Sequence, residues 1–159
     1  MADSDIKGRC GCGELQYRVT AKPMYVQCCH CSECQHQTGA PFVVNALLET
    51  SAVELLSGET ETTLFDTGSG AGHEVIRCAS CKTPVWSYYL ALGRNIAFLR
   101  VGTLDDSSVF PPDIHVFTRS KLDWTLIPTD AAAVEEFYRF KELWPEESMA
   151  RFKAAMSAA

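Results

Sequence analysis

The sequence has no long apolar run and little basic charge. It has 14 Lys and Arg against 20 Asp and Glu in 159 residues, which gives a formal net charge of −6. Nucleic-acid binding requires clustered Lys and Arg, and anionic membrane surfaces attract cations. No stretch approaches the roughly 18 apolar residues of a membrane-spanning helix. We therefore expect neither a nucleic-acid partner nor a membrane partner.

The sequence also lacks the features of a secreted or repetitive protein. Residues 1–7 are polar and acidic, without the apolar core of a signal peptide, and there is no repeat of fixed period. We therefore expect a cytoplasmic protein, in which thiols stay reduced. Clustered cysteines in that compartment favour metal binding, and disulfides are the alternative that this setting disfavours.

Residues 14–125 follow the pattern of short β-strands. Leu15, Tyr17 and Val19 alternate with polar residues, as in a strand with one buried face. Short runs of β-branched and aromatic residues predict further strands at 41–48, 84–89, 95–101, 114–117 and 122–125. Turn signals separate these runs, including a glycine-rich hairpin loop at 68–72. This spacing favours an antiparallel sheet or sandwich over alternating strands and helices.

The sequence changes character after Pro128. Thr129 or Asp130 can cap a helix that begins at Ala131, and Pro145 can end that helix and open a second one. The apolar residues at helical spacing are Val134, Phe137, Tyr138 and Leu143 or Trp144, followed by Met149, Phe152 and Met156. We therefore predict a mainly β domain at 1–127 and a helical extension at 128–159. The extension is expected to pack on the same domain, with a lid or a homodimer contact as its functional alternatives.

Seven of the eight cysteines lie in three tight clusters, which form two unequal sets of metal ligands. Cys10 and Cys12 would share a face if they lay in a strand, and Cys78 and Cys81 have the spacing of a zinc knuckle. Two such pairs far apart in sequence commonly meet at one tetrahedral zinc. We therefore predict a structural zinc on these four residues.

The middle cluster supplies three thiols, Cys29, Cys31 and Cys34, within six residues. Zinc with three protein ligands keeps a position open, and a three-thiolate zinc suits a thiol ligand better than water activation. A zinc-held thiol is a nucleophile that can attack an aldehyde carbon. An iron–sulfur cluster is the weaker alternative. Cys28 or His30 could supply a fourth ligand, although His30 is expected to point away.

The motifs GRCGCG at 8–13, CHCSEC at 29–34 and RCASC at 77–81 resemble those of the glutathione-dependent formaldehyde-activating enzyme family, which includes the centromere protein V domain. Motifs at 102–106, 112–115 and 120–124 are also similar. The resemblance implies a zinc-bound β-tent of coiled antiparallel sheets, with a structural zinc on the outer cysteine pairs and a catalytic zinc on the middle three. Lys82 follows the last motif, where the family usually has glycine.

The resemblance further implies that glutathione and formaldehyde are joined into S-hydroxymethylglutathione, a carbon–sulfur lyase reaction. Two Zn²⁺ ions per chain are then expected, with glutathione sulfur as fourth ligand of the catalytic one. The alternatives are a non-catalytic module that binds glutathione or another thiol, and a structural protein with a closed second site. His73 is expected at the surface or in a hydrogen bond, and His115 in a hydrogen bond or a substrate contact. The candidate partners for the glutathione carboxylates are Arg77, Arg94, Arg100, Arg119 and Lys121.

Overall fold

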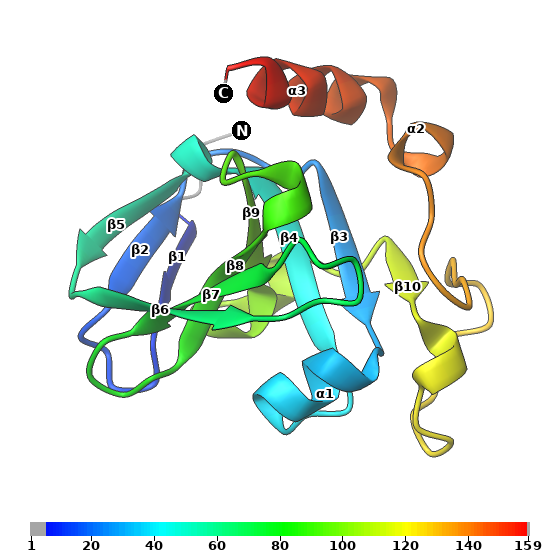
Figure 1. Ribbon diagram of the computed structural model, residues 1–159, viewed down its shortest axis with the longest axis horizontal. Coiled ribbons are helices and arrows are strands. Elements are labelled where there is room, and N and C mark those ends of the chain that lie inside the picture. Colours follow the sequence, from blue (N-terminus) through cyan, green and yellow to red (C-terminus); the bar gives the residue numbers. More distant parts are fainter. Residues whose placement is uncertain (1–5, 159) are drawn as a thin grey trace.

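Two β-sheets form the body of the computed structural model, which describes residues 6–158 (Figure 1). The smaller sheet has the order β1 (Ile6–Arg9), β2 (Gln16–Val19) and β5 (Val53–Ser57). The larger has the order β10 (Ile114–Val116), β3 (Tyr25–Cys29), β4 (Val43–Glu49), β9 (Ile96–Arg100), β8 (Pro84–Tyr89), β7 (His73–Cys78) and β6 (Thr60–Phe65). Neighbouring strands are antiparallel except β10 and β3. The predicted mainly β class is confirmed; the first five residues of the expected β domain lie outside the described part.

Short helical segments connect and follow these strands. The α-helices are α1 (Ser32–Thr38), α2 (Phe140–Leu143) and α3 (Glu146–Ser157). The 3₁₀ turns are η1 (Thr50–Ala52), η2 (Leu90–Leu92), η3 (Val101–Thr103), η4 (Ser107–Val109) and η5 (Thr118–Ser120). Within residues 6–158, no helix is long and apolar enough to cross a membrane.

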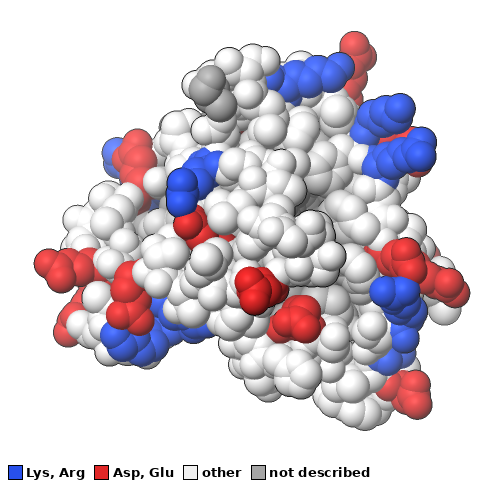
Figure 2. All heavy atoms as spheres, viewed as in Figure 1, with Lys and Arg blue, Asp and Glu red and all other residues white. Residues whose placement is uncertain are grey.

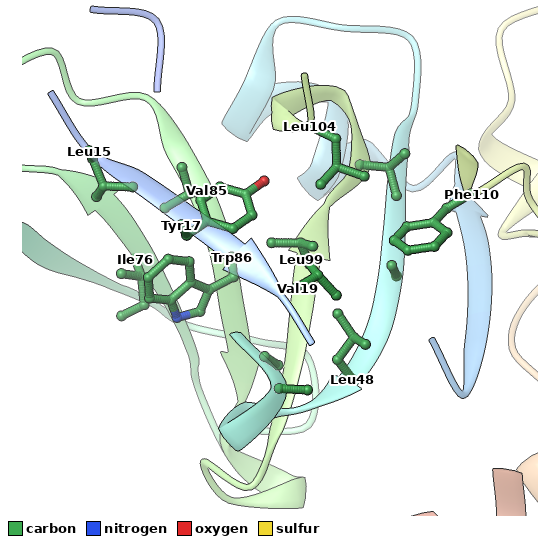
Figure 3. Close-up of a cluster of buried hydrophobic side chains, with 14 of the residues drawn as sticks. Leu15, Tyr17, Val19, Leu48, Ile76, Val85, Trp86, Leu99, Leu104 and Phe110 are labelled. Carbon is green, nitrogen blue, oxygen red and sulfur yellow. The ribbon is translucent and has the colours of Figure 1, made fainter. Parts of the chain in front are cut away.

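The main core fills the space between the two sheets (Figure 3). Tyr17 of β2 is fully buried, as the sequence alternation predicts, and its ring packs edge-on against Trp86 of β8 with centroids 6.2 Å apart. Leu99 of β9 enters this core, whereas its neighbour Phe98 enters a second core on the opposite face of the large sheet. Strand β9 is consequently buried at every position, as its apolar sequence suggests.

Helix α3 covers part of the second core. Met149, Phe152 and Met156 pack there with Trp144, so the helix predicted to open at Pro145 is confirmed. The Arg151 guanidinium also pairs with both carboxylate oxygens of Glu49, at the end of β4. The C-terminal part of the chain is therefore fixed to the large sheet by both apolar packing and an ion pair.

The helix predicted to begin at Ala131 is wrong. Instead, residues 132–136 run beside β10 in an irregular path, and within residues 131–144 α2 is the only helix. The His115 N–H donates to the Ala132 carbonyl at 2.8 Å, and the Val134 N–H donates to the His115 carbonyl at 2.9 Å. The open edge of β10 satisfies these backbone groups, so tertiary pairing prevails over the helical spacing of the side chains.

The strand predicted at 122–125 is also wrong. The Thr125 N–H donates to the Leu122 carbonyl at 2.9 Å and closes a turn. The Lys121 ammonium donates to the Leu122 and Thr125 carbonyls at 3.0 and 2.8 Å, which holds the turn from one side. Trp124 stays 70% exposed, so its apolar ring does not mark a core strand.

Candidate metal centres

Four cysteines converge where the turns after β1 and β7 meet. The sulfurs of Cys10, Cys12, Cys78 and Cys81 all lie within 4.8 Å of one another, and all four are free thiols. The Cys10–Cys12 and Cys12–Cys78 sulfur separations are 3.3 and 3.9 Å. A tetrahedral zinc with bonds of about 2.3 Å separates its sulfurs by about 3.8 Å. These four residues could therefore hold such an ion.

The route by which Cys10 and Cys12 meet differs from the sequence prediction. Strand β1 ends at Arg9, so a turn, rather than the alternation of a strand, brings the two thiols together. In the same cluster, a hydrogen bond from the Thr83 hydroxyl, 3.1 Å from the sulfur, lowers the pKa of Cys81 to about 5. This thiol is accordingly prepared for the ionised form that metal binding requires.

Lys82 occupies an unusual backbone position just after Cys81. Its φ of 64° lies in the left-handed region that favours glycine. Its N–H donates to the Cys78 carbonyl at 3.0 Å, and its ammonium contacts Glu61 at 2.6 Å and the Ala79 carbonyl at 2.7 Å. The tight turn explains why glycine suits this position, and the side-chain contacts show how a lysine is accommodated.

The three other clustered cysteines lie at the junction of β3 and α1. Cys29 ends the strand, Cys31 caps the helix and Cys34 lies in its first turn, and their sulfurs are within 4.8 Å of one another. The Cys34 N–H donates to the Cys31 sulfur at 3.3 Å. Hydrogen bonds from the Cys29 and Cys34 thiols, together with this N–H, hold the pKa of Cys31 well below its usual range. The cluster therefore favours negative charge on Cys31.

Cys28 and His30 belong to a separate cluster. Neighbours in a strand point to opposite faces, so Cys28 lies across β3 from Cys29. Its sulfur is 3.6 Å from Nε2 of His30, and that nitrogen is 3.0 Å from Nδ1 of His115. Burial lowers the pKa of His30 to about 4, so this imidazole is neutral at physiological pH. His30 thus turns away from the three-cysteine cluster, and His115 takes the hydrogen-bonding role.

A pocket of about 570 Å³ opens onto Cys29, Cys31 and Cys34. Five aromatic rings line it: Tyr89, Phe98, Phe117, Phe137 and Phe140. The glycine-rich loop between β6 and β7 borders it through Gly68 and Ser69. His73 also lines it, and is buried and stacked on Tyr89 with ring centroids 4.1 Å apart. Of the roles expected for His73, the hydrogen bond is present, through Gln37, and the surface position is wrong.

The sequence pattern does not predict the aromatic wall of this pocket. The sequence spacing predicts Phe137 in a helical stripe, whereas the segment paired with β10 presents it to the pocket together with Phe140. The density of aromatic residues between 137 and 144 was the available signal. It could not be interpreted, because the path of that segment depends on the sheet edge.

None of the five basic residues proposed as carboxylate partners lines the pocket. Arg94 pairs with Glu74, and Arg119 pairs with Glu136. Buried Arg100 donates to the Asn45 side chain at 2.7 Å. Arg77 donates to the Lys82 carbonyl, and Lys121 donates to the turn described above.

Comparison with known proteins gives one family match. The family model described as glutathione-dependent formaldehyde-activating enzyme matches residues 5–120. A solved structure from Rhodobacter sphaeroides is similar at 21% identity and a TM-score of 0.47, over 62% of this chain and 87% of that chain. No curated protein matches. The matched range contains all seven clustered cysteines and ends before the segment that carries Phe137 and Phe140.

Proposed function

This chain belongs to the glutathione-dependent formaldehyde-activating enzyme family, and from that premise we propose that it is a zinc-dependent enzyme of the carbon–sulfur lyase type. It would join a thiol to a small aldehyde such as formaldehyde. The observation that carries the proposal is the convergence of three thiols on a pocket of about 570 Å³. Small-molecule sites typically have volumes of about 300–1,000 Å³.

Cys29, Cys31 and Cys34 would hold the zinc of this centre. Thiolates suit zinc, and three protein donors leave a fourth position for an exogenous ligand. When bound, zinc would supply positive charge that keeps a thiol substrate ionised at neutral pH. The Cys34 N–H, which donates to the Cys31 sulfur, supports negative charge on that ligand.

The reaction forms one S–C bond and breaks the π bond of the aldehyde carbonyl, while the thiol proton ends on the new hydroxyl group. The chain contributes position and exclusion of water. The Gln35 amide donates to the His30 and Ser120 carbonyls at 2.9 and 3.0 Å, which fixes α1 and its cysteines relative to η5. The aromatic lining keeps water away from the reacting groups.

For Cys10, Cys12, Cys78 and Cys81 we propose a structural zinc. Four protein donors leave no position for substrate. Cys12 and Cys78 are 66 residues apart, and they follow or end strands of different sheets, so a shared ion would link the two sheets directly. A structural zinc of this kind contributes on the order of 10 kcal/mol to folding.

The test of the reaction is exchange NMR on zinc-loaded protein mixed with formaldehyde and a panel of thiols that includes glutathione. Adduct exchange should be faster than the spontaneous reaction, and Cys31→Ser should abolish the acceleration. Cys28→Ala is the matched control, because Cys28 is buried and belongs to neither proposed ligand set. Zinc content measured on each variant separates loss of metal from loss of chemistry.

Two results would count against this function. No acceleration with any thiol of the panel, at full zinc loading, would remove the enzymatic proposal. Thiol binding without acceleration, measured by calorimetry, would instead support the non-catalytic binding module.

A further inference from the structure

The charge of the three-cysteine pocket is unusual for a glutathione site. Its charged lining residues are Glu33 and Asp66, and no Lys or Arg among residues 6–158 lines it. On the face drawn in Figure 2, most basic side chains lie toward the outline, and the centre is white apart from acidic side chains. The pocket surface is therefore mainly apolar, with two acidic residues and uncharged donors such as Gln37 and Ser69. Buried Arg100 lies outside this lining; it donates to Asn45, and its Nε and Nη2 have no hydrogen-bond partner in the described part of the chain.

Glutathione does not match this surface. At neutral pH it carries two carboxylates and one ammonium group, so its net charge is negative. Enclosing a carboxylate without a cation in contact costs several kcal/mol, and the negative charges of Glu33 and Asp66 would repel it. Arg94 and Arg119 lie outside the lining and are paired with Glu74 and Glu136.

An apolar group matches the pocket well. Phe98, Phe117 and Phe140 supply rings from β9, from the residue after β10 and from α2, so apolar surface faces the pocket from several sides. Phe137 adds a ring that remains 44% exposed. Enclosing a bound aromatic group would remove this apolar surface from water, at about 25 cal/mol per Å², with ring–ring contacts in addition.

The aromatic wall is firmly held, so it is a permanent part of the pocket. The Tyr138 hydroxyl donates to the Gln27 side chain at 3.2 Å, and the Trp144 indole donates to that hydroxyl at 3.0 Å. Phe140 stacks on Trp144 with centroids 4.4 Å apart. These anchors lie between the residues that line the pocket and helix α3.

We propose that the thiol taken by this pocket carries an uncharged aromatic or aliphatic group, and that glutathione is disfavoured. The inference rests on the proposed function, because it assigns the substrate class of the same centre. The selecting residues, Phe137 and Phe140, lie beyond the range 5–120 that matches the family. The preference is therefore a property of this chain's C-terminal segment.

The test compares benzyl mercaptan with glutathione on zinc-loaded full-length protein, by calorimetry and by the formaldehyde exchange assay. Benzyl mercaptan should bind about tenfold more tightly, the change expected from enclosing one aromatic group. Phe140→Ala should remove most of that preference, because it should weaken the binding of benzyl mercaptan far more than that of glutathione. If the alanine variant folds poorly, Phe140→Leu takes its place. Leucine keeps an apolar side chain, so this variant should retain part of the preference.

Leu143→Ala is the matched control, because Leu143 lies on α2 but does not line the pocket. Equal or tighter binding of glutathione by the wild type would overturn the inference. An equal loss for both thiols in Phe140→Ala would also overturn it, because that pattern marks a purely structural role. If benzyl mercaptan binds preferentially but no thiol reacts, the substrate class stands and the reaction falls. If glutathione binds more tightly and reacts, the proposed reaction stands and the proposed substrate class falls.

Discussion

The two cysteine clusters have the same donor chemistry and opposite surroundings. Cys12 and Cys81 are exposed in turns at the end of the molecule where two hairpins meet. Cys29 and Cys34 are buried at a strand–helix junction that opens onto an aromatic pocket. The difference teaches that ligand type alone does not assign a role. Ligand number and the surroundings of the ligands are the basis on which we propose a structural role for the first cluster and a catalytic role for the second.

The clusters also depend on different parts of the chain. The four-cysteine cluster joins β1 of the small sheet to β7 of the large sheet. The three-cysteine cluster comes from one short stretch, and its pocket is completed by residues far along the chain, such as Phe140. Loss of the first cluster should therefore unfold the protein, whereas loss of the second should disable it.

Cys78→Ser should have the largest effect on stability. Cys78 is only 1% exposed and would contribute one of four zinc ligands. Loss of a structural zinc removes free energy of folding on the order of 10 kcal/mol, so the protein should unfold or melt far below the wild type. Circular dichroism melting together with zinc analysis measures this. A variant that stays folded with full zinc content would break the comparison, and Cys28→Ala should remain folded.

Cys31→Ser should abolish activity with a much smaller loss of stability. The fold would keep its four-cysteine zinc, so zinc content should fall by one ion per chain while the circular dichroism spectrum is retained. Ser32→Ala, an exposed neighbour on α1, is the control and should keep both ions. Unfolding of Cys31→Ser to the extent expected for Cys78→Ser would erase the distinction between the centres.

Arg151→Ala should weaken the docking of α3 on the large sheet. At neutral pH it should lower the free energy of unfolding by about 1 kcal/mol, since the Arg151–Glu49 ion pair is bidentate and partly buried. Hydrogen bonds from Arg151 lower the pKa of Glu49 in the folded state. The stabilisation is thus complete above the unfolded pKa of about 4.3 and is lost as the pH falls through the folded value.

Urea unfolding at a series of pH values checks this pH dependence. The difference between wild type and Arg151→Ala should shrink as the solution is acidified. Lys153→Ala, an exposed position on the same helix, should show no such trend. A difference that is constant with pH would mean that the ion pair does not stabilise the docking of α3.

Lys82→Gly should have the smallest effect on the free energy of unfolding, and it should be stabilising. Glycine removes the left-handed backbone strain, which costs about 1 kcal/mol. Two losses oppose this gain: the partly exposed ion pair with Glu61, which contributes little, and the larger conformational entropy of glycine in the unfolded chain. The net change in urea unfolding should be a stabilisation of less than about 1 kcal/mol. Lys82→Ala loses the ion pair while keeping the strain, so it should be no more stable than the wild type.

Much of the β fold could be predicted because its signals are local. The alternation at Leu15, Tyr17 and Val19 corresponds to buried side chains just before and within β2, and the apolar run at 84–89 corresponds to β8. The cysteine clusters can be predicted equally well, because residues close in sequence must be close in space. The grouping of Cys10 and Cys12 with Cys78 and Cys81 followed from the chemistry of tetrahedral zinc.

The rest depended on partners distant in sequence. Val134 and Phe137 have helical spacing, yet their segment pairs with β10, whose open edge cannot be inferred from residues 131–139. Trp124 resembles a core residue but lies in a turn fastened by Lys121. The pocket wall was missed for the same reason, since Phe117 and Phe140 meet only after both segments are placed.

The stretch at 132–136 has a second consequence, which concerns solubility. An open strand edge is a template for pairing with another chain, and natural proteins cover or disrupt such edges. By running along β10, this stretch covers one edge of the seven-stranded sheet, and the residues that immediately follow it include Phe137 and Phe140. Edge protection and the proposed ligand preference thus depend on one continuous segment. A deletion in this segment that altered the pocket would also expose the strand edge. Related proteins with a different ligand preference should therefore differ by substitutions of the aromatic residues more often than by the length of the segment.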